Sequence, residues 1–209
     1  MRVIIFSWEF PPRIVGKLAD YVKDLALQLA KNGVKTHVVT YHDYLTGEFE
    51  ENGEVKTYRV TNPVKTHISV LTWVLTLNQE VERAAANIYR ANRQVDLIDV
   101  HEWHFIPAAV TLKKALGIPF IYSVESLEDH RSPGVDNPFN MAIKSIEWLG
   151  TYEAQKIIVK SEWMASEVAR IYKVPLEKVK VVTPKSATWL KTILETYNSL
   201  RKERNSNVA

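Results

Sequence analysis

Short runs of β-branched residues alternate with longer amphipathic stretches along the chain, and this alternation limits the fold more than any other feature. The apolar runs lie at residues 2–7, 35–41, 55–60, 97–100, 120–124, 156–159 and 179–182. Several are apolar at consecutive positions, which is typical of strands that are covered on both faces of a sheet. Helices between such strands favour right-handed crossovers and a mainly parallel sheet. The pattern predicts a doubly wound α/β domain with about seven strands.

The stretches between the strands have the periodicity of helices, at residues 17–32, 69–92, 106–116, 138–152, 162–172 and 187–202. In the first, Leu18, Tyr21, Val22, Leu25 and Leu29 share one stripe, and Gly33 is suited to a left-handed stop. Residues 48–53 are expected to form a hairpin turn before the third strand. We expect one domain over residues 1–182, a closing helix of the same domain over 183–203, and a disordered tail over 204–209.

Composition excludes several classes of function. The net charge is +3, from 27 Lys and Arg against 24 Asp and Glu, and the two signs are interspersed, so no nucleic-acid partner is expected. The absence of Cys excludes thiol catalysis and disulfides. No apolar run approaches the roughly 20 residues of a membrane span, and the first residues read as a strand and not as a signal peptide. We therefore expect a cytoplasmic protein with no membrane span.

Ligands of open α/β sheets bind at the carboxyl ends of the strands, so the loops there hold the candidate site residues. The loop after the first strand contains Glu9, Gly16 and Lys17. A glycine at the start of a helix lets a ligand approach free backbone amides, which can bind an anion. The loop lacks the dinucleotide fingerprint G-x-G-x-x-G, so a loop that merely turns a corner is the alternative.

The loop after the fourth strand reads His101-Glu102-Trp103-His104. Two imidazoles, a carboxylate and an indole suit a polar ligand, and the indole offers a face to a sugar ring. Two residues separate the histidines, and not the three of the helical zinc signature, so we expect no metal. Structural histidines at the end of the strand are the alternative.

The loop after the fifth strand carries Glu125, Ser126, Glu128 and Arg131. Carboxylates in this position are able to bind sugar hydroxyls or to act as general acid and base. The alternative is a solvated acidic loop without a role in binding.

Taken together in order and spacing, four segments resemble the retaining, two-domain glycosyltransferases related to glycogen and starch synthases. The segments are Glu9-Phe10-Pro11-Pro12 with Gly16, residues 96–104, residues 117–128, and residues 147–180 with Ser161, Met164 and Tyr172. The resemblance covers about residues 1–182. It implies the Rossmann-like N-terminal, acceptor-side domain of the GT-B fold.

Three departures from the family pattern bear on activity. Lys17 stands where the family has a second glycine near the donor, and Glu125 stands where it has a histidine of the donor-sugar site. A carboxylate there is expected to repel a phosphate-bearing donor. The family's second domain, which holds the nucleotide, has no counterpart, whereas residues 186–202 resemble the family's last helix, which crosses back onto the first domain. A natural loss and a designed deletion would both leave this pattern.

The resemblance therefore implies the acceptor-side half of a hexosyl-transferring enzyme, inactive alone or dependent on a separate nucleotide-sugar-binding domain. We expect no resident cofactor, because the nucleotide-sugar donor would need that partner. The catalytic candidates are His101, His104 and Glu125. The candidate substrate-binding residues are Glu9, Gly16, Lys17, His101, Glu102, Trp103, His104, Glu125, Ser126, Glu128 and Arg131. The alternatives are a non-catalytic module that binds a glucan or a small sugar, and a homo-oligomer that covers the former domain interface.

Overall fold

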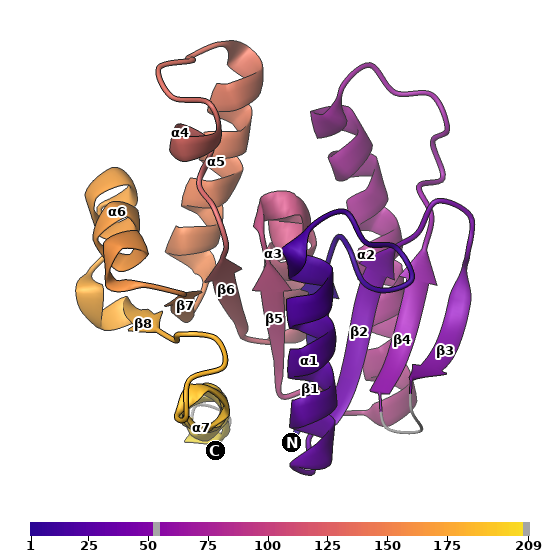
Figure 1. Ribbon diagram of the computed structural model, residues 1–209. Helices are drawn as coiled ribbons and strands as arrows, with labels where there is room; N and C mark the ends of the chain where they lie inside the picture. The colour runs from indigo at the N-terminus through magenta and orange to yellow at the C-terminus, as the bar shows by residue number, and fades with distance from the viewer. Residues whose placement is uncertain (52–54, 207–209) are drawn as a thin grey trace.

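The computed structural model describes residues 1–51 and 55–206 as an α/β protein built on one eight-stranded sheet (Figure 1). The strands are β1 (Arg2–Ser7), β2 (Lys35–Tyr41), β3 (Gly47–Glu51), β4 (Val55–Val60), β5 (Leu97–His101), β6 (Phe120–Val124), β7 (Lys156–Val159) and β8 (Val179–Val181). The helices are α1 (Lys17–Lys31), α2 (Val70–Asn92), α3 (Ile106–Leu116), α4 (Glu128–Arg131), α5 (Pro138–Glu153), α6 (Glu162–Tyr172) and α7 (Trp189–Ser206). Two 3₁₀ turns, η1 (Trp103–Phe105) and η2 (Leu176–Lys178), complete the described elements.

The strand order is β3-β4-β2-β1-β5-β6-β7-β8, and every pairing is parallel except that of β3 with β4. The chain proceeds outward from β1 to β2 and β4 and then returns to β5 on the other side of β1. The order therefore reverses between β1 and β5, where such folds form their ligand sites. The register pairs Ser7 with His101 and His101 with Ser123, so the carboxyl ends of β1, β5 and β6 meet.

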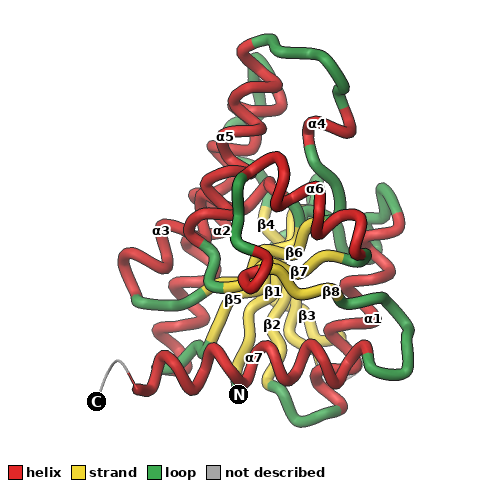
Figure 2. The backbone as a smooth tube through the Cα atoms, turned by 90° about the vertical axis from the view of Figure 1, so that its left-hand side faces the viewer, coloured by secondary structure: helices red, strands yellow, loops and turns green. Residues whose placement is uncertain are grey.

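Helices cover both faces of the sheet, as the apolar strands require. In β1, Ile4 and Phe6 belong to the core under α2, α3 and α6, whereas Val3 and Ile5 belong to the core under α1 and α7. The helix α7 lies beside α1 and close to the N-terminus, as Figure 2 shows. Its buried side chains in this core are Trp189, Ile193, Tyr197 and Leu200. The predicted closing helix thus packs on the sheet and seals one face of the core.

Two expectations about chain segments need correction. Residues 47–51 form the antiparallel edge strand β3, whereas a turn was expected from residue 48; positions 52 and 53 of that turn lie outside the described residues. The pairing is supported by the Glu48–Lys56 ion pair of 2.7 Å and by the Arg59 guanidinium 4.5 Å from the Phe49 ring centroid. Such cross-strand pairs stabilise an edge that has only weak strand propensity.

The second correction concerns the C-terminus. The helix α7 begins at Trp189, two residues later than expected, and extends to Ser206. The expected disordered tail is therefore helical over residues 204–206, and residues 207–209 lie outside the described part. Residues without Gly or Pro can continue a helix that tertiary packing has already nucleated. Within residues 1–51 and 55–206, no helix is both long and apolar enough to cross a membrane.

Candidate functional site

Five side chains from four elements converge beside the carboxyl ends of β5, β6 and β7, and we call them the His101 cluster: Tyr21, Asp99, His101, Glu125 and Lys160. His101 ends β5 and is 1% exposed. Its Nε2 lies 3.5 Å from Asp99 Oδ2, and its Nδ1 lies 3.9 Å from Glu125 Oε1. Parallel pairing of β5 with β6 and β6 with β7 brings these groups to one edge.

Asp99 anchors the cluster from inside the protein. It is 1% exposed and accepts hydrogen bonds from Ser123 Oγ at 2.6 Å and from the hydroxyl of Tyr197 on α7. Burial raises the pKa of Asp99, but His101 and these hydrogen bonds outweigh it, so the pKa is lowered. Burial lowers the pKa of His101, yet the neighbouring Asp99 and Glu125 raise it to about 9. The two groups therefore form a buried pair of opposite charges at neutral pH.

Glu125 is bound to Lys160, which follows β7, and the Lys160 Nζ also lies 4.0 Å from the centroid of the Tyr21 ring. Burial raises the pKa of Glu125, but His101 and Lys160 outweigh it, so the pKa is lowered. Two cations thus surround the Glu125 carboxylate, and the expectation that it repels a phosphate-bearing donor stays a prediction. Sequence reasoning missed Asp99, Tyr21 and Lys160; only the place of Lys160 after a parallel strand could have indicated it.

In the loop between β1 and α1, the Glu9 carboxylate binds two backbone amides of the same loop. Glu9 is 3% exposed, and its Oε2 accepts hydrogen bonds from the amides of Val15 and Gly16 at 2.6 and 2.7 Å. A Cβ added to Gly16 would lie 3.5 Å from Glu9 Oε1, an ordinary contact, so the loop does not require glycine there. Lys17 is exposed at the start of α1. The two amides that precede α1 are thus already occupied by a carboxylate.

His104 belongs to a separate aromatic stack. Its ring lies 4.7 Å from that of Trp8 and 4.3 Å from that of Trp103, nearly parallel to the Trp8 ring. Burial, with smaller contributions from Arg131 and Arg13, lowers the pKa of His104 to about 3, so the imidazole is neutral. Trp103 is 4% exposed and packs against Val74 and Ile143. The expectation that Trp103 offers a face to a sugar ring is therefore wrong.

The acidic loop is organised around Arg131. Its guanidinium donates to Glu147 Oε1 at 2.6 Å, to Glu128 Oε2 at 3.0 Å, to Ser126 Oγ at 2.6 Å and to Glu102 Oε2 at 3.4 Å. Glu128 is 3% exposed and Glu147 is fully buried. The alternative of a solvated acidic loop is wrong, because these carboxylates are buried and paired with a common cation.

Glu102 connects this network to the His101 cluster. Its Oε1 accepts hydrogen bonds from the amides of Glu125 and Ser126, both at 2.8 Å. Burial raises the pKa of Glu102 to about 7, although the nearby Arg131 opposes the increase. Glu102 also has a positive φ of 66°, which is uncommon for a residue with a side chain. Glu102 and Arg131 therefore hold the loop that presents Glu125.

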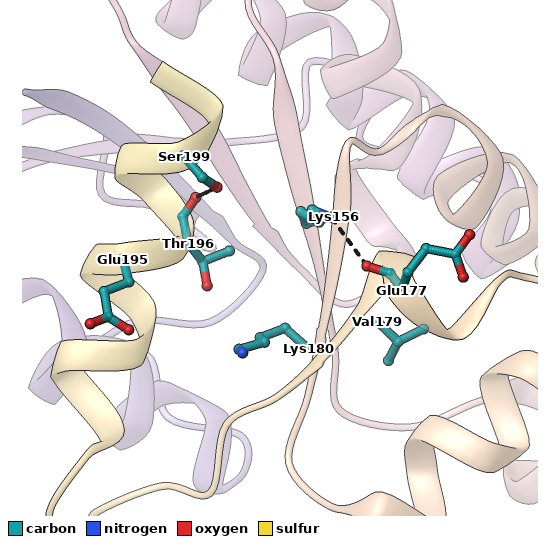
Figure 3. A pocket seen from close by; sticks show the side chains of 7 residues that line it. All are labelled: Lys156, Glu177, Val179, Lys180, Glu195, Thr196 and Ser199. Carbon is teal, nitrogen blue, oxygen red and sulfur yellow. Dashed lines mark hydrogen bonds between the residues drawn. The ribbon is translucent and has the colours of Figure 1, made fainter. Parts of the chain in front are cut away.

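The structure thus brings His101 and Glu125 together but places His104 in the aromatic stack. Among the described residues, no three His, Asp or Glu side chains are arranged to hold a metal ion. A groove of about 270 Å³ between β8 and α7 is lined by Lys156, Glu177, Val179, Lys180, Glu195, Thr196 and Ser199 (Figure 3). Because Lys156 begins β7, this groove lies toward the amino ends of the strands, away from the His101 cluster.

Comparison with known proteins identifies relatives of this arrangement. The family model "Glycosyltransferase Family 4" matches residues 18–184. An uncharacterised glycosyltransferase of Methanocaldococcus jannaschii is 35% identical over 184 residues, covering 87% of this chain and 45% of the relative. A glycogen synthase of Mycobacterium tuberculosis is 22% identical over 200 residues, covering 87% of this chain and 47% of the relative. The chain spans about half the length of these relatives.

Solved structures show the same fold. A sucrose-phosphate synthase of Thermosynechococcus elongatus superposes with a TM-score of 0.71 at 17% identity, over 87% of this chain and 47% of that one. A second chain of that enzyme, designated 27_220_406_426, superposes with a TM-score of 0.69 at 15% identity, over 97% of this chain and 98% of that one. The family model covers well over half of the sequence, and the chain belongs to glycosyltransferase family 4.

Proposed function

We propose that this chain forms the acceptor-side half of a glycosyltransferase and transfers a hexosyl group only with a second, nucleotide-sugar-binding half. The observation that carries the proposal is the His101 cluster, which sits at the carboxyl edge of the sheet next to the strand-order reversal. A buried imidazolium beside a carboxylate can hydrogen-bond to sugar hydroxyls or stabilise negative charge on a leaving group.

Transfer of a phosphate-linked sugar needs charge neutralisation and positioning from both sides of a cleft. The described residues supply one side, and the match to about half of each full-length relative agrees with this division. The match along nearly all of the chain designated 27_220_406_426 supports a unit that includes the closing helix. A cytoplasmic location remains part of the proposal.

Mass-detected transfer from UDP-glucose or ADP-glucose tests the proposal. The chain alone is expected to give no transfer above background. Adding the nucleotide-binding half of the Methanocaldococcus relative is expected to produce transfer that is lost in His101→Asn. Efficient transfer by the chain alone would show that it is not half of a site. Transfer by the mixture that is unchanged in His101→Asn would remove the His101 cluster from the reaction.

Carbohydrate binding without transfer is a second candidate, favoured by the exposed indole of Trp163. This side chain is 60% exposed in the first turn of α6, three residues after Lys160. Indole faces bind sugar rings by stacking. Calorimetry with soluble glucan is expected to show binding that Trp163→Ala abolishes. Trp148→Ala, a change at a position on α5 that is 50% exposed, is expected to preserve this binding. Equal loss in both variants, or no binding by the wild type, would reject this role.

Self-association is a third candidate, favoured by exposed apolar side chains on α5. Met141, Trp148 and Tyr152 are 54%, 50% and 66% exposed. Side chains of this kind commonly mark contact surfaces. Light scattering of a self-associating chain would give a mass above the 24.0 kDa of one copy, and a monomer at high concentration would reject this arrangement.

A further inference from the structure

Two cationic side chains, His101 and Lys160, contact the two oxygens of the Glu125 carboxylate. The Glu125 Oε1 lies 3.9 Å from Nδ1 of His101, and Oε2 accepts a hydrogen bond from Nζ of Lys160. The carboxylate thus meets one cation with each oxygen. This is the arrangement that a protein offers to the oxygens of a bound carboxylate or phosphate.

Neither cation owes its position to Glu125 alone. His101 is held between Glu125 and Asp99, and Asp99 is itself fixed by Ser123 and Tyr197. Lys160 lies against the face of the Tyr21 ring, a contact that attracts an ammonium group. Both cations are therefore expected to stay in place when the Glu125 carboxylate leaves.

The imidazole of His101 has unused hydrogen-bonding capacity. It is 1% exposed, yet neither of its nitrogens makes a hydrogen bond of normal geometry with any other residue of the described structure. Its contact with Glu125 is an ion pair at 3.9 Å, longer than a hydrogen bond. A buried donor without a partner is costly, so an oxygen that approaches Nδ1 more closely would gain free energy.

Glu125 is also able to leave. Its side chain is 18% exposed and that of Lys160 is 33% exposed, so the pair lies at the boundary with solvent. A rotation of the Glu125 side chain toward solvent would open the position between the two cations without moving the strands.

We propose that His101 and Lys160 form a binding site for an anionic group, a phosphate or a carboxylate, which Glu125 fills from within the chain until a ligand displaces it. Glu125 is then a competitor of the ligand and not one of its contacts. The inference goes beyond the proposed glycosyl transfer and does not depend on it, because anion binding is measured without a donor, an acceptor or a second domain.

Calorimetric titration with inorganic phosphate at pH 7 tests the site in Glu125→Gln, which keeps the shape of the side chain and removes its charge. The apparent dissociation constant is expected to fall about tenfold or more below that of the wild type, since a charge-assisted contact to the ligand replaces an internal one. The matched control is Glu125→Gln with Lys160→Met, in which the gain is expected to disappear.

Glu125→Ala serves as a second single variant, and far-UV circular dichroism checks the folding of each protein. A folded Glu125 variant that binds neither phosphate nor acetate more tightly than the wild type would overturn the proposal, as would a gain that survives Lys160→Met. Titration with acetate in the same variants identifies the ligand class. Tighter binding of phosphate assigns the site to phosphoryl groups, tighter binding of acetate assigns it to carboxylates, and binding of neither overturns it.

Discussion

The hydroxyl of Tyr197 joins the closing helix α7 to the His101 cluster, and its removal in Tyr197→Phe tests whether that helix is part of the site's framework. Tyr197 is fully buried and donates its hydroxyl proton to Asp99, which is 1% exposed. The substitution preserves the ring and its packing in the core under α1 and α7. It therefore removes one hydrogen bond to a buried charge and little else.

The expected loss follows from the nature of the acceptor. Hydrogen bonds to charged groups contribute about 1.5–3 kcal/mol to stability, and a buried carboxylate cannot recover the lost donor from water. Asp99 keeps Ser123 and His101 as partners, so the loss should stay within that range. For a chain of this size, such a loss lowers the melting temperature by about 3–12 °C.

Urea unfolding followed by circular dichroism measures the free energy of unfolding, and differential scanning calorimetry measures the melting temperature. Tyr44→Phe is the matched control, because Tyr44 is 79% exposed and its change should cost less than about 0.5 kcal/mol. If Tyr197→Phe and Tyr44→Phe have the same free energy of unfolding, the hydrogen bond from Tyr197 to Asp99 contributes nothing to stability. The helix α7 then does not stabilise the His101 cluster through this bond.

Three further outcomes are expected. Burial lowers the pKa of His101, but Asp99 and Glu125 raise it to about 9, so the charged His101 stabilises the fold fully below about pH 6.5 and loses this effect as the pH rises through about 9. The free energy of unfolding should therefore fall by up to about 3 kcal/mol over this range. A His101→Gln variant should lack this pH dependence. Glu147→Gln should cost about 1.5–3 kcal/mol in urea unfolding, because it weakens a charged hydrogen bond to Arg131, which keeps Glu128 and Glu102 as partners, and a loss under about 0.5 kcal/mol would contradict the importance of that ion pair. Gly150→Ala should lower the melting temperature despite better helix propensity, since its Cβ would lie 2.8 Å from a side chain of α3, and an increase would show that α3 can yield.

Most of the fold followed from local pattern. The limits of α3 and α6 agree with the expected residues 106–116 and 162–172, because proline near the start of α3, a serine cap before α6 and sharp changes of periodicity mark their ends. Gly33 has a positive φ of 78°, as a left-handed stop requires. The edge strand β3 was missed because its sequence, GEFEE, has little strand propensity and depends on cross-strand pairing with β4.

The site was predictable in place but not in its contacts. The loops that carry His101 and Glu125 were identified because parallel strands deliver their carboxyl ends to one edge. Whether a side chain there faces a ligand or another part of the protein depends on residues far away in the sequence. Glu9 turned out to bind its own loop, and Trp103 to lie in the core. The role of Glu125 in glycosyl transfer stays a prediction.

The sequence by itself determined the order and type of the main elements, since hydrophobic periodicity and helix stops act over a few residues. Only the tertiary structure decided the charge of the site. Asp99 and His101 are two residues apart on one strand, but Tyr197 reaches Asp99 across 98 positions of the sequence and Lys160 reaches Glu125 across 35. Burial strengthens every interaction among these groups because water no longer screens them, and burial is a property of the assembled fold.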